Sequence, residues 1–71
     1  MCVVSMKSMT MAIKAQKALN NALINCEIIK LEPHMTQKGC AYGIKFDCIN
    51  TYAVMNVLND KKIKFTEIFN L

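Results

Sequence analysis

Arginine is absent from this chain of 71 residues, and its net charge of +4 comes entirely from lysine. The nine lysines are spread over positions 7 to 64 rather than gathered in one segment. Proteins that bind nucleic acids commonly use arginine for paired hydrogen bonds to bases and phosphates. A dispersed set of lysines is more typical of a solvated surface. We therefore do not expect nucleic acid as a partner.

Long apolar runs are also lacking. No run approaches the ~20 residues that a membrane-spanning helix needs. The first residues, MCVVSMKSMTM, do not combine a basic segment with a long apolar one, as a secretion signal does. We therefore expect a cytoplasmic protein, with no membrane as a partner, in which the four cysteines are free thiols. The apolar fraction of 54% is sufficient for one folded domain spanning residues 1–71.

Motifs of several site classes are missing as well. There is no C-x-x-C pair and only one histidine, so neither a metal site nor a cofactor is predicted. No glycine-rich phosphate loop follows the first apolar segment, which weakens the case for a small-ligand regulatory domain. His34 and Cys40 lie six residues apart, but no third orienting residue or oxyanion motif accompanies them. Hydrolysis is therefore not favoured.

Local patterns divide the chain into six elements. Ser8 is a suitable N-cap for a first helix, and Pro33 ends the second strand because it cannot donate to a β-ladder. Asp47 or Asn50 is the expected cap of the second helix. The predicted order is strand, helix, strand, strand, helix, strand, at residues 2–6, about 9–23, 26–32, 41–47, about 50–61 and 64–70. This order predicts an α+β, ferredoxin-like βαββαβ fold, with an antiparallel sheet ordered 4-1-3-2 and both helices on one face.

The apolar positions of these elements predict which faces are buried. In the third strand, Tyr42, Ile44 and Phe46 alternate with smaller or charged residues, so they are expected to share one face. Helical spacing predicts two buried stripes, formed by Ala12, Ala15, Leu19 and Leu23 in the first helix and by Ala53, Val54, Val57 and Leu58 in the second.

The four cysteines separate into two places in this fold. Cys40 and Cys48 flank the third strand, roughly 26 Å apart at about 3.3 Å per residue, which is too far for a disulfide. The end of that strand, near Cys48, lies beside the starts of the first two strands, where Cys2 and Cys26 occur. We expect these three cysteines to pack at strand ends as small hydrophobic residues.

Cys40 is predicted to lie at the opposite edge, near the start of the first helix. It follows Gly39 in a polar connection and is expected to be accessible. The helix start at Ser8 and the charges of Lys7 and Lys38 would lower the pKa of a nearby thiol. Cys40 is therefore the candidate functional thiol.

The first helix carries the pattern Ser-x-x-x-Ala-x-x-Ala-Glu-Lys-x-Leu at Ser8, Ala12, Ala15, Lys17 and Leu19, with Gln16 in place of glutamate. Pro33 ends the second strand, and Phe46 follows Cys40 by six residues. This combined spacing, over nearly the whole chain, resembles that of the small selenium/sulfur carrier-like proteins. His34 stands where the family usually has arginine, and Ala41 replaces the glycine that usually follows the cysteine.

The resemblance implies a carrier that is not a turnover enzyme. Cys40 would hold a persulfide or perselenide and pass it to a partner protein, after loading by a cysteine desulfurase-like donor. Gly39, Ala41, His34, Lys38, Lys7 and Ser8 would support that thiol.

A non-catalytic interaction module remains the main alternative. Apolar residues occupy both phases of two strands, at Ile28 and Ile29 and at Ile68 and Phe69. One phase is expected to face the helices and the other to be exposed, where it would serve as a protein interface or a homodimer contact.

Overall fold

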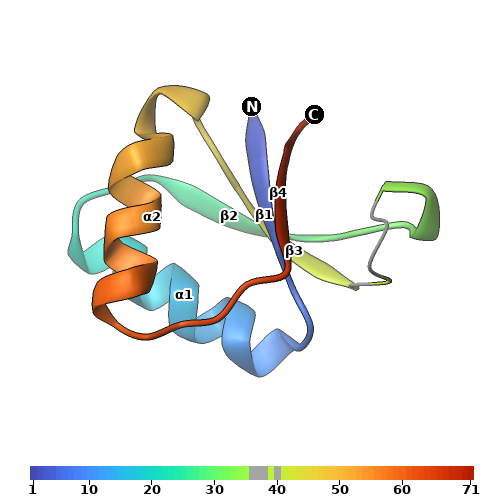
Figure 1. Cartoon of the computed structure of the whole chain (residues 1–71), viewed down its shortest axis with the longest axis horizontal. Coiled ribbons are helices and arrows are strands. Elements are labelled where there is room, and N and C mark those ends of the chain that lie inside the picture. The colour runs from blue at the N-terminus through green and yellow to red at the C-terminus, as the bar shows by residue number, and fades with distance from the viewer. Residues whose placement is uncertain (36–38, 40) are drawn as a thin grey trace.

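The computed structural model describes residues 1–35, 39 and 41–71 and contains four strands and two α-helices (Figure 1). Short 3-10 turns precede β3 and α2. Along the chain the elements are β1 (Cys2–Met6), α1 (Met9–Asn21), β2 (Cys26–Lys30), η1 (Pro33–Met35), β3 (Tyr42–Phe46), η2 (Cys48–Asn50), α2 (Thr51–Asp60) and β4 (Glu67–Asn70). The predicted first strand is confirmed residue for residue. The last strand begins three residues later than predicted.

All strand pairs of the sheet are antiparallel, and the sheet order is β2-β3-β1-β4. Read from the β4 edge, the same order is 4-1-3-2. Cys2 and Cys26 both pair with Phe46, so two of the cysteines flank the end of β3. At the other end of β1, Met6 pairs with Tyr42, and the start of β3 therefore lies beside the β1–α1 junction.

Both helices pack on the same side of this sheet. Alternate strand residues, including Val4, Ile44 and Phe46, form one cluster with side chains from α1 and α2. The helices contribute Ala12, Ala15, Leu19, Val54 and Leu58, all fully buried. The predicted stripes are thus confirmed at these positions, and Val57 packs at their edge. Ala53 was wrongly assigned, because α2 turns that position to solvent.

Each helix ends in the same turn. After α1, Leu23 has a φ of 63°, and the Ile24 N–H donates to the Leu19 carbonyl at 2.9 Å. After α2, Lys62 has a φ of 56°, and Ile63 donates to Leu58 in the same way at 2.8 Å. These are Schellman turns, in which the residue of positive φ points outward and the next residue returns to the core.

This turn explains why the predicted burial of Leu23 is wrong. The helix stops at Asn21, and Leu23 is 93% exposed. Ile24 takes the place in the core that the helical spacing assigned to Leu23, with only 8% of its surface exposed.

Side chains of the protein itself cover the centre of the sheet face that has no helices. Val3 and Leu31 are buried there beside Gly43. A Cβ atom on Gly43 would lie 2.7 Å from Val3 Cγ1, so any other residue at this position would force the Val3 side chain to shift. Ile29 and Phe69 are half-buried on the same face. The centre of that face is therefore not the open apolar surface expected for an interaction module.

Candidate functional site

Cys40 and Lys38 lie outside the described residues, but the chain on either side of Cys40 is defined. Gly39 is exposed with a φ of 73°, a conformation that glycine adopts without strain. Ala41 is exposed, and its carbonyl accepts a hydrogen bond from the Leu31 N–H at 2.8 Å. The residues that flank the candidate thiol are thus at the surface, and the second of them is fixed to the end of β2.

Ser8 caps the start of α1, as the sequence predicted. Its hydroxyl accepts the Met11 N–H at 3.2 Å, and its carbonyl accepts the Ala12 N–H at 3.1 Å. The preceding residue, Lys7, is exposed. Met6, at the end of β1, pairs with Tyr42, at the start of β3. The capped helix start and Lys7 therefore lie at the same end of these strands as the chain that enters β3.

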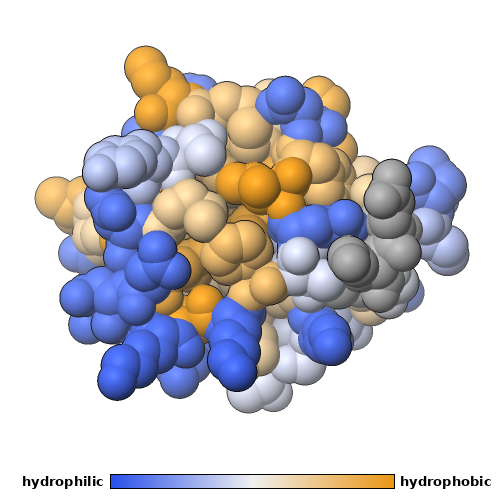
Figure 2. Space-filling model, viewed as in Figure 1, coloured by the Kyte–Doolittle hydropathy of each residue, from blue (hydrophilic) through white to orange (hydrophobic). Residues whose placement is uncertain are grey.

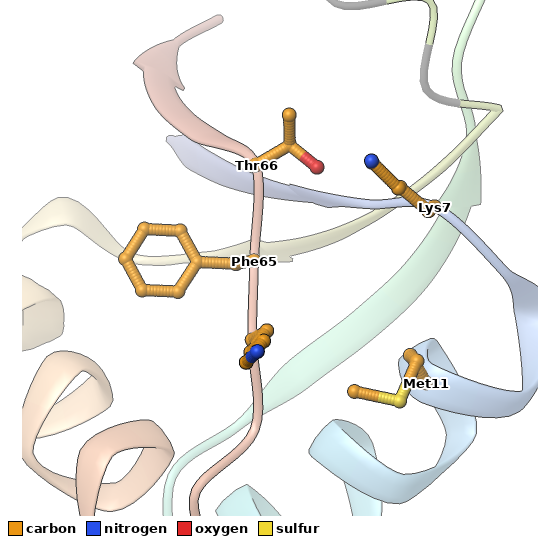
Figure 3. A pocket seen from close by; sticks show the side chains of 5 residues that line it. Lys7, Met11, Phe65 and Thr66 are labelled. Carbon is orange, nitrogen blue, oxygen red and sulfur yellow. The ribbon is translucent and has the colours of Figure 1, made fainter.

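A hollow of about 500 Å³ opens beside this helix start (Figure 3). In the close-up, the Lys7 side chain rises toward Thr66, and Met11 extends from α1. Among the described residues, the hollow is lined by Lys7, Met11, Lys64, Phe65 and Thr66, which include two cationic side chains and no acidic one. An anion at this edge would therefore meet favourable charge.

His34 lies at the surface. It lies in η1, and its Nδ1 is 3.7 Å from Glu32 Oε2, with both side chains mostly exposed. A contact between two such exposed side chains is largely screened by water. The expected support of Cys40 by His34 involves a residue outside the described chain and stays a prediction.

Cys2 and Cys48 form a disulfide, which corrects the prediction that all four cysteines are free thiols. Their Cα atoms are 5.0 Å apart, within the range that such a bond requires. Cys2 pairs across from Phe46, and the η2 turn folds the chain back so that Cys48 reaches it. The sequence correctly predicted the shared edge but not the bond.

Side chains of α2 and β4 surround this disulfide. Asn70 Oδ1 lies 3.0 Å from the Cys2 sulfur and 3.1 Å from the Cys48 sulfur. The Thr51 hydroxyl donates to the Cys48 carbonyl at 2.6 Å and is 4.0 Å from the Cys2 sulfur. Neither Thr51 nor Asn70 was predicted from the sequence as part of a site. The only available signal was the antiparallel register, which pairs Cys2 with Asn70.

Cys26 is the free cysteine among the described residues. Its sulfur lies between the Gln16 carbonyl, at 4.0 Å, and the Asn20 side-chain oxygen, at 3.8 Å. Burial raises the pKa of the Cys26 thiol above its ordinary value. Since the thiolate is the nucleophile, Cys26 is a weak one near neutral pH.

Within the described chain, residues 1–35, 39 and 41–71, no group of three histidine, cysteine or acidic side chains could hold a metal ion. In the same residues, no helix has the length and apolar character needed to cross a membrane.

Comparison with known proteins gives one finding. Residues 1–70 match the model of the family described as "Putative Se/S carrier protein-like". Searches of the curated proteins and of the solved structures return no match.

Proposed function

Because the chain belongs to the Se/S carrier protein-like family, whose model covers residues 1–70, we propose that it carries sulfur or selenium on Cys40. That match, over nearly the whole chain, is the observation that supports the proposal. The protein then acts as a carrier rather than a turnover enzyme, without a cofactor. Its βαββαβ order is consistent with a ferredoxin-like arrangement, which we include in the proposal together with a cytoplasmic location.

Two sulfur-transfer steps make up the proposed cycle. The Cys40 thiolate attacks the terminal sulfur of a persulfide on a cysteine desulfurase-like donor. The donor's sulfur–sulfur bond breaks, its cysteine leaves as a thiolate, and Cys40 becomes a persulfide. An acceptor thiolate then attacks that terminal sulfur and releases the Cys40 thiolate. A perselenide follows the same two steps with selenium as the transferred atom.

The chemistry of the other cysteines supports the choice of Cys40. Cys2 and Cys48 are bonded to each other, so neither offers a thiolate. The raised pKa of Cys26 keeps its proton in place and makes it a poor acceptor of sulfur. These grounds disfavour the three cysteines that the structure describes, and the proposal therefore rests on Cys40, which lies outside the described residues.

Charge near the helix start supports it further. The Ser8 cap begins α1, and Lys7 and Lys64 line the adjoining hollow. Partial positive charge at a helix N-terminus and nearby ammonium groups favour a thiolate and a persulfide anion over their protonated forms. Both supports lie at the edge where the chain enters β3.

Intact mass spectrometry tests the proposal. The full chain is incubated with a cysteine desulfurase and cysteine, and its mass is measured without reductant. We expect the gain of one sulfur atom in the unaltered protein and in a Cys26→Ser variant, and no gain in a Cys40→Ser variant. No gain in the unaltered protein, or equal gain in Cys40→Ser, would contradict the proposal. Replacing cysteine by selenocysteine in the same reaction tests selenium as cargo.

A further inference from the structure

We propose that the Cys2–Cys48 disulfide is a second reactive centre, which exchanges with dithiols through attack on the Cys48 sulfur. It lies at the opposite end of β1 from the start of α1, since Cys2 begins that strand and Met6 ends it. The proposal does not depend on the carrier function of Cys40.

The two sulfurs differ in their surroundings. Cys2 is 8% exposed and belongs to the hydrophobic core. Cys48 lies in the short η2 turn and is only partly buried, at the edge of that core. Exchange requires a thiolate to approach one sulfur in line with the bond. A small hollow of about 200 Å³ adjoins Cys2, but Cys48 is the more exposed of the two residues, so the proposal takes Cys48 as the sulfur attacked and Cys2 as the sulfur that leaves.

Asn70 is placed to stabilise the opened form. In the disulfide neither sulfur carries a proton, so the distances of 3.0 and 3.1 Å to Asn70 Oδ1 are plain contacts. After reduction, each sulfur regains a proton, and the same oxygen can accept a hydrogen bond from either thiol. Asn70 is therefore a positioning residue that favours the dithiol over the disulfide.

Exposed apolar side chains flank the same place. Met1 adjoins Cys2, Ile49 adjoins Cys48, and Leu71, which adjoins Asn70, donates its N–H to the Met1 carbonyl at 2.9 Å. Ile49 is 85% exposed. In Figure 1 the two ends of the chain and η2 lie at the same end of the molecule, at the top of the view, and in Figure 2 this end carries both apolar and polar side chains. A dithiol protein with an apolar surface around its reactive cysteine fits this site.

The reaction balances as a two-electron exchange. A thiolate of the dithiol attacks Cys48 Sγ, the bond between Cys48 and Cys2 breaks, and Cys2 leaves as a thiolate that takes up a proton. The second thiol of the dithiol loses its proton and attacks the other sulfur of the dithiol, which is bonded to Cys48 in the mixed disulfide. Cys48 then leaves as a thiolate, and the dithiol is oxidised to a disulfide.

Dithiothreitol serves as the probe, with the full chain carrying Cys40→Ser to remove the other candidate thiol. We expect a reduction rate that rises in proportion to dithiothreitol concentration and is unchanged by urea below the unfolding transition. A rate that stops rising with dithiothreitol, or that rises steeply with urea, would mean that the bond opens only on unfolding, and would overturn the proposal. With glutathione and an acid quench, the mixed disulfide should map to Cys48. An adduct on Cys2 would refute the assigned direction of attack.

The role of Asn70 is tested by equilibrium. In mixtures of reduced and oxidised dithiothreitol, Asn70→Leu should lower the equilibrium constant for opening roughly fivefold, as expected for the loss of one hydrogen bond. The control variant Asn56→Leu, which alters an exposed asparagine of α2, should leave it unchanged. Urea midpoints of the oxidised proteins verify that both variants fold. An unchanged constant in a folded Asn70→Leu variant would refute this role.

Discussion

Opening the Cys2–Cys48 disulfide should remove a large part of the stability of this domain. The bond joins residues separated by 46 positions. In the chain-entropy account, closing a loop of that length restricts the unfolded chain and stabilises the native state by about 4 kcal/mol. A domain of this size is expected to have only about 4–10 kcal/mol in total. The reduced protein should therefore be close to the limit of stable folding.

Urea unfolding measures this effect directly. We compare the oxidised and the reduced protein, and expect the midpoint to fall by several molar at an m-value of about 1 kcal/mol/M. The double variant Cys2→Ala/Cys48→Ala should show no dependence on reductant. A Cys26→Ala variant should keep the full dependence, because Cys26 is outside the bond. Equal midpoints for the oxidised and reduced protein would show that the disulfide does not stabilise the native state, contrary to this prediction.

Three further predictions concern backbone, packing and pH. Leu23→Gly and Lys62→Gly should each raise the free energy of unfolding by about 0.5–1 kcal/mol in urea, because glycine adopts positive φ freely, while Leu23→Ala should give no such gain. Gly43→Ala should lower the free energy of unfolding by about 1–3 kcal/mol because of the clash with Val3, and adding Val3→Ala should recover part of that loss. Additive losses in the double variant would contradict the packing described. Burial raises the pKa of Cys26, so the folded protein holds the proton more tightly, and its stability should fall as the pH rises from the ordinary cysteine pKa through the raised one. Alkylation with mass mapping should place the midpoint of Cys26 above that of an unfolded thiol, and an equal midpoint would contradict this.

Much of the architecture could be predicted because each local pattern agreed with the fold. The alternation of Tyr42, Ile44 and Phe46 identified the face of β3 that meets the helices. The predicted antiparallel pairing also brought Cys2, Cys26 and Cys48 to one edge, as the observed register confirms for the two that lie in strands.

Other features depended on geometry that a local pattern does not encode. The burial of Leu23 was predicted from helical spacing, but the Schellman turn places Ile24 in the core instead. The disulfide required the path of η2, because only that turn brings Cys48 within reach of Cys2. Free thiols were expected for all four cysteines, but the Cα atoms of Cys2 and Cys48 lie 5.0 Å apart, which permits the bond. Asn70 is distant in sequence from both sulfurs and gave no local signal.

The proposed carrier function requires that Cys40 holds the transferred sulfur. Mass mapping of the protein after incubation with a cysteine desulfurase and cysteine locates the added sulfur. We expect a single added sulfur on the peptide that contains Cys40, lost to a small thiol acceptor and absent in Cys40→Ser. An added sulfur on the Cys26 peptide, or none on any peptide, would contradict it.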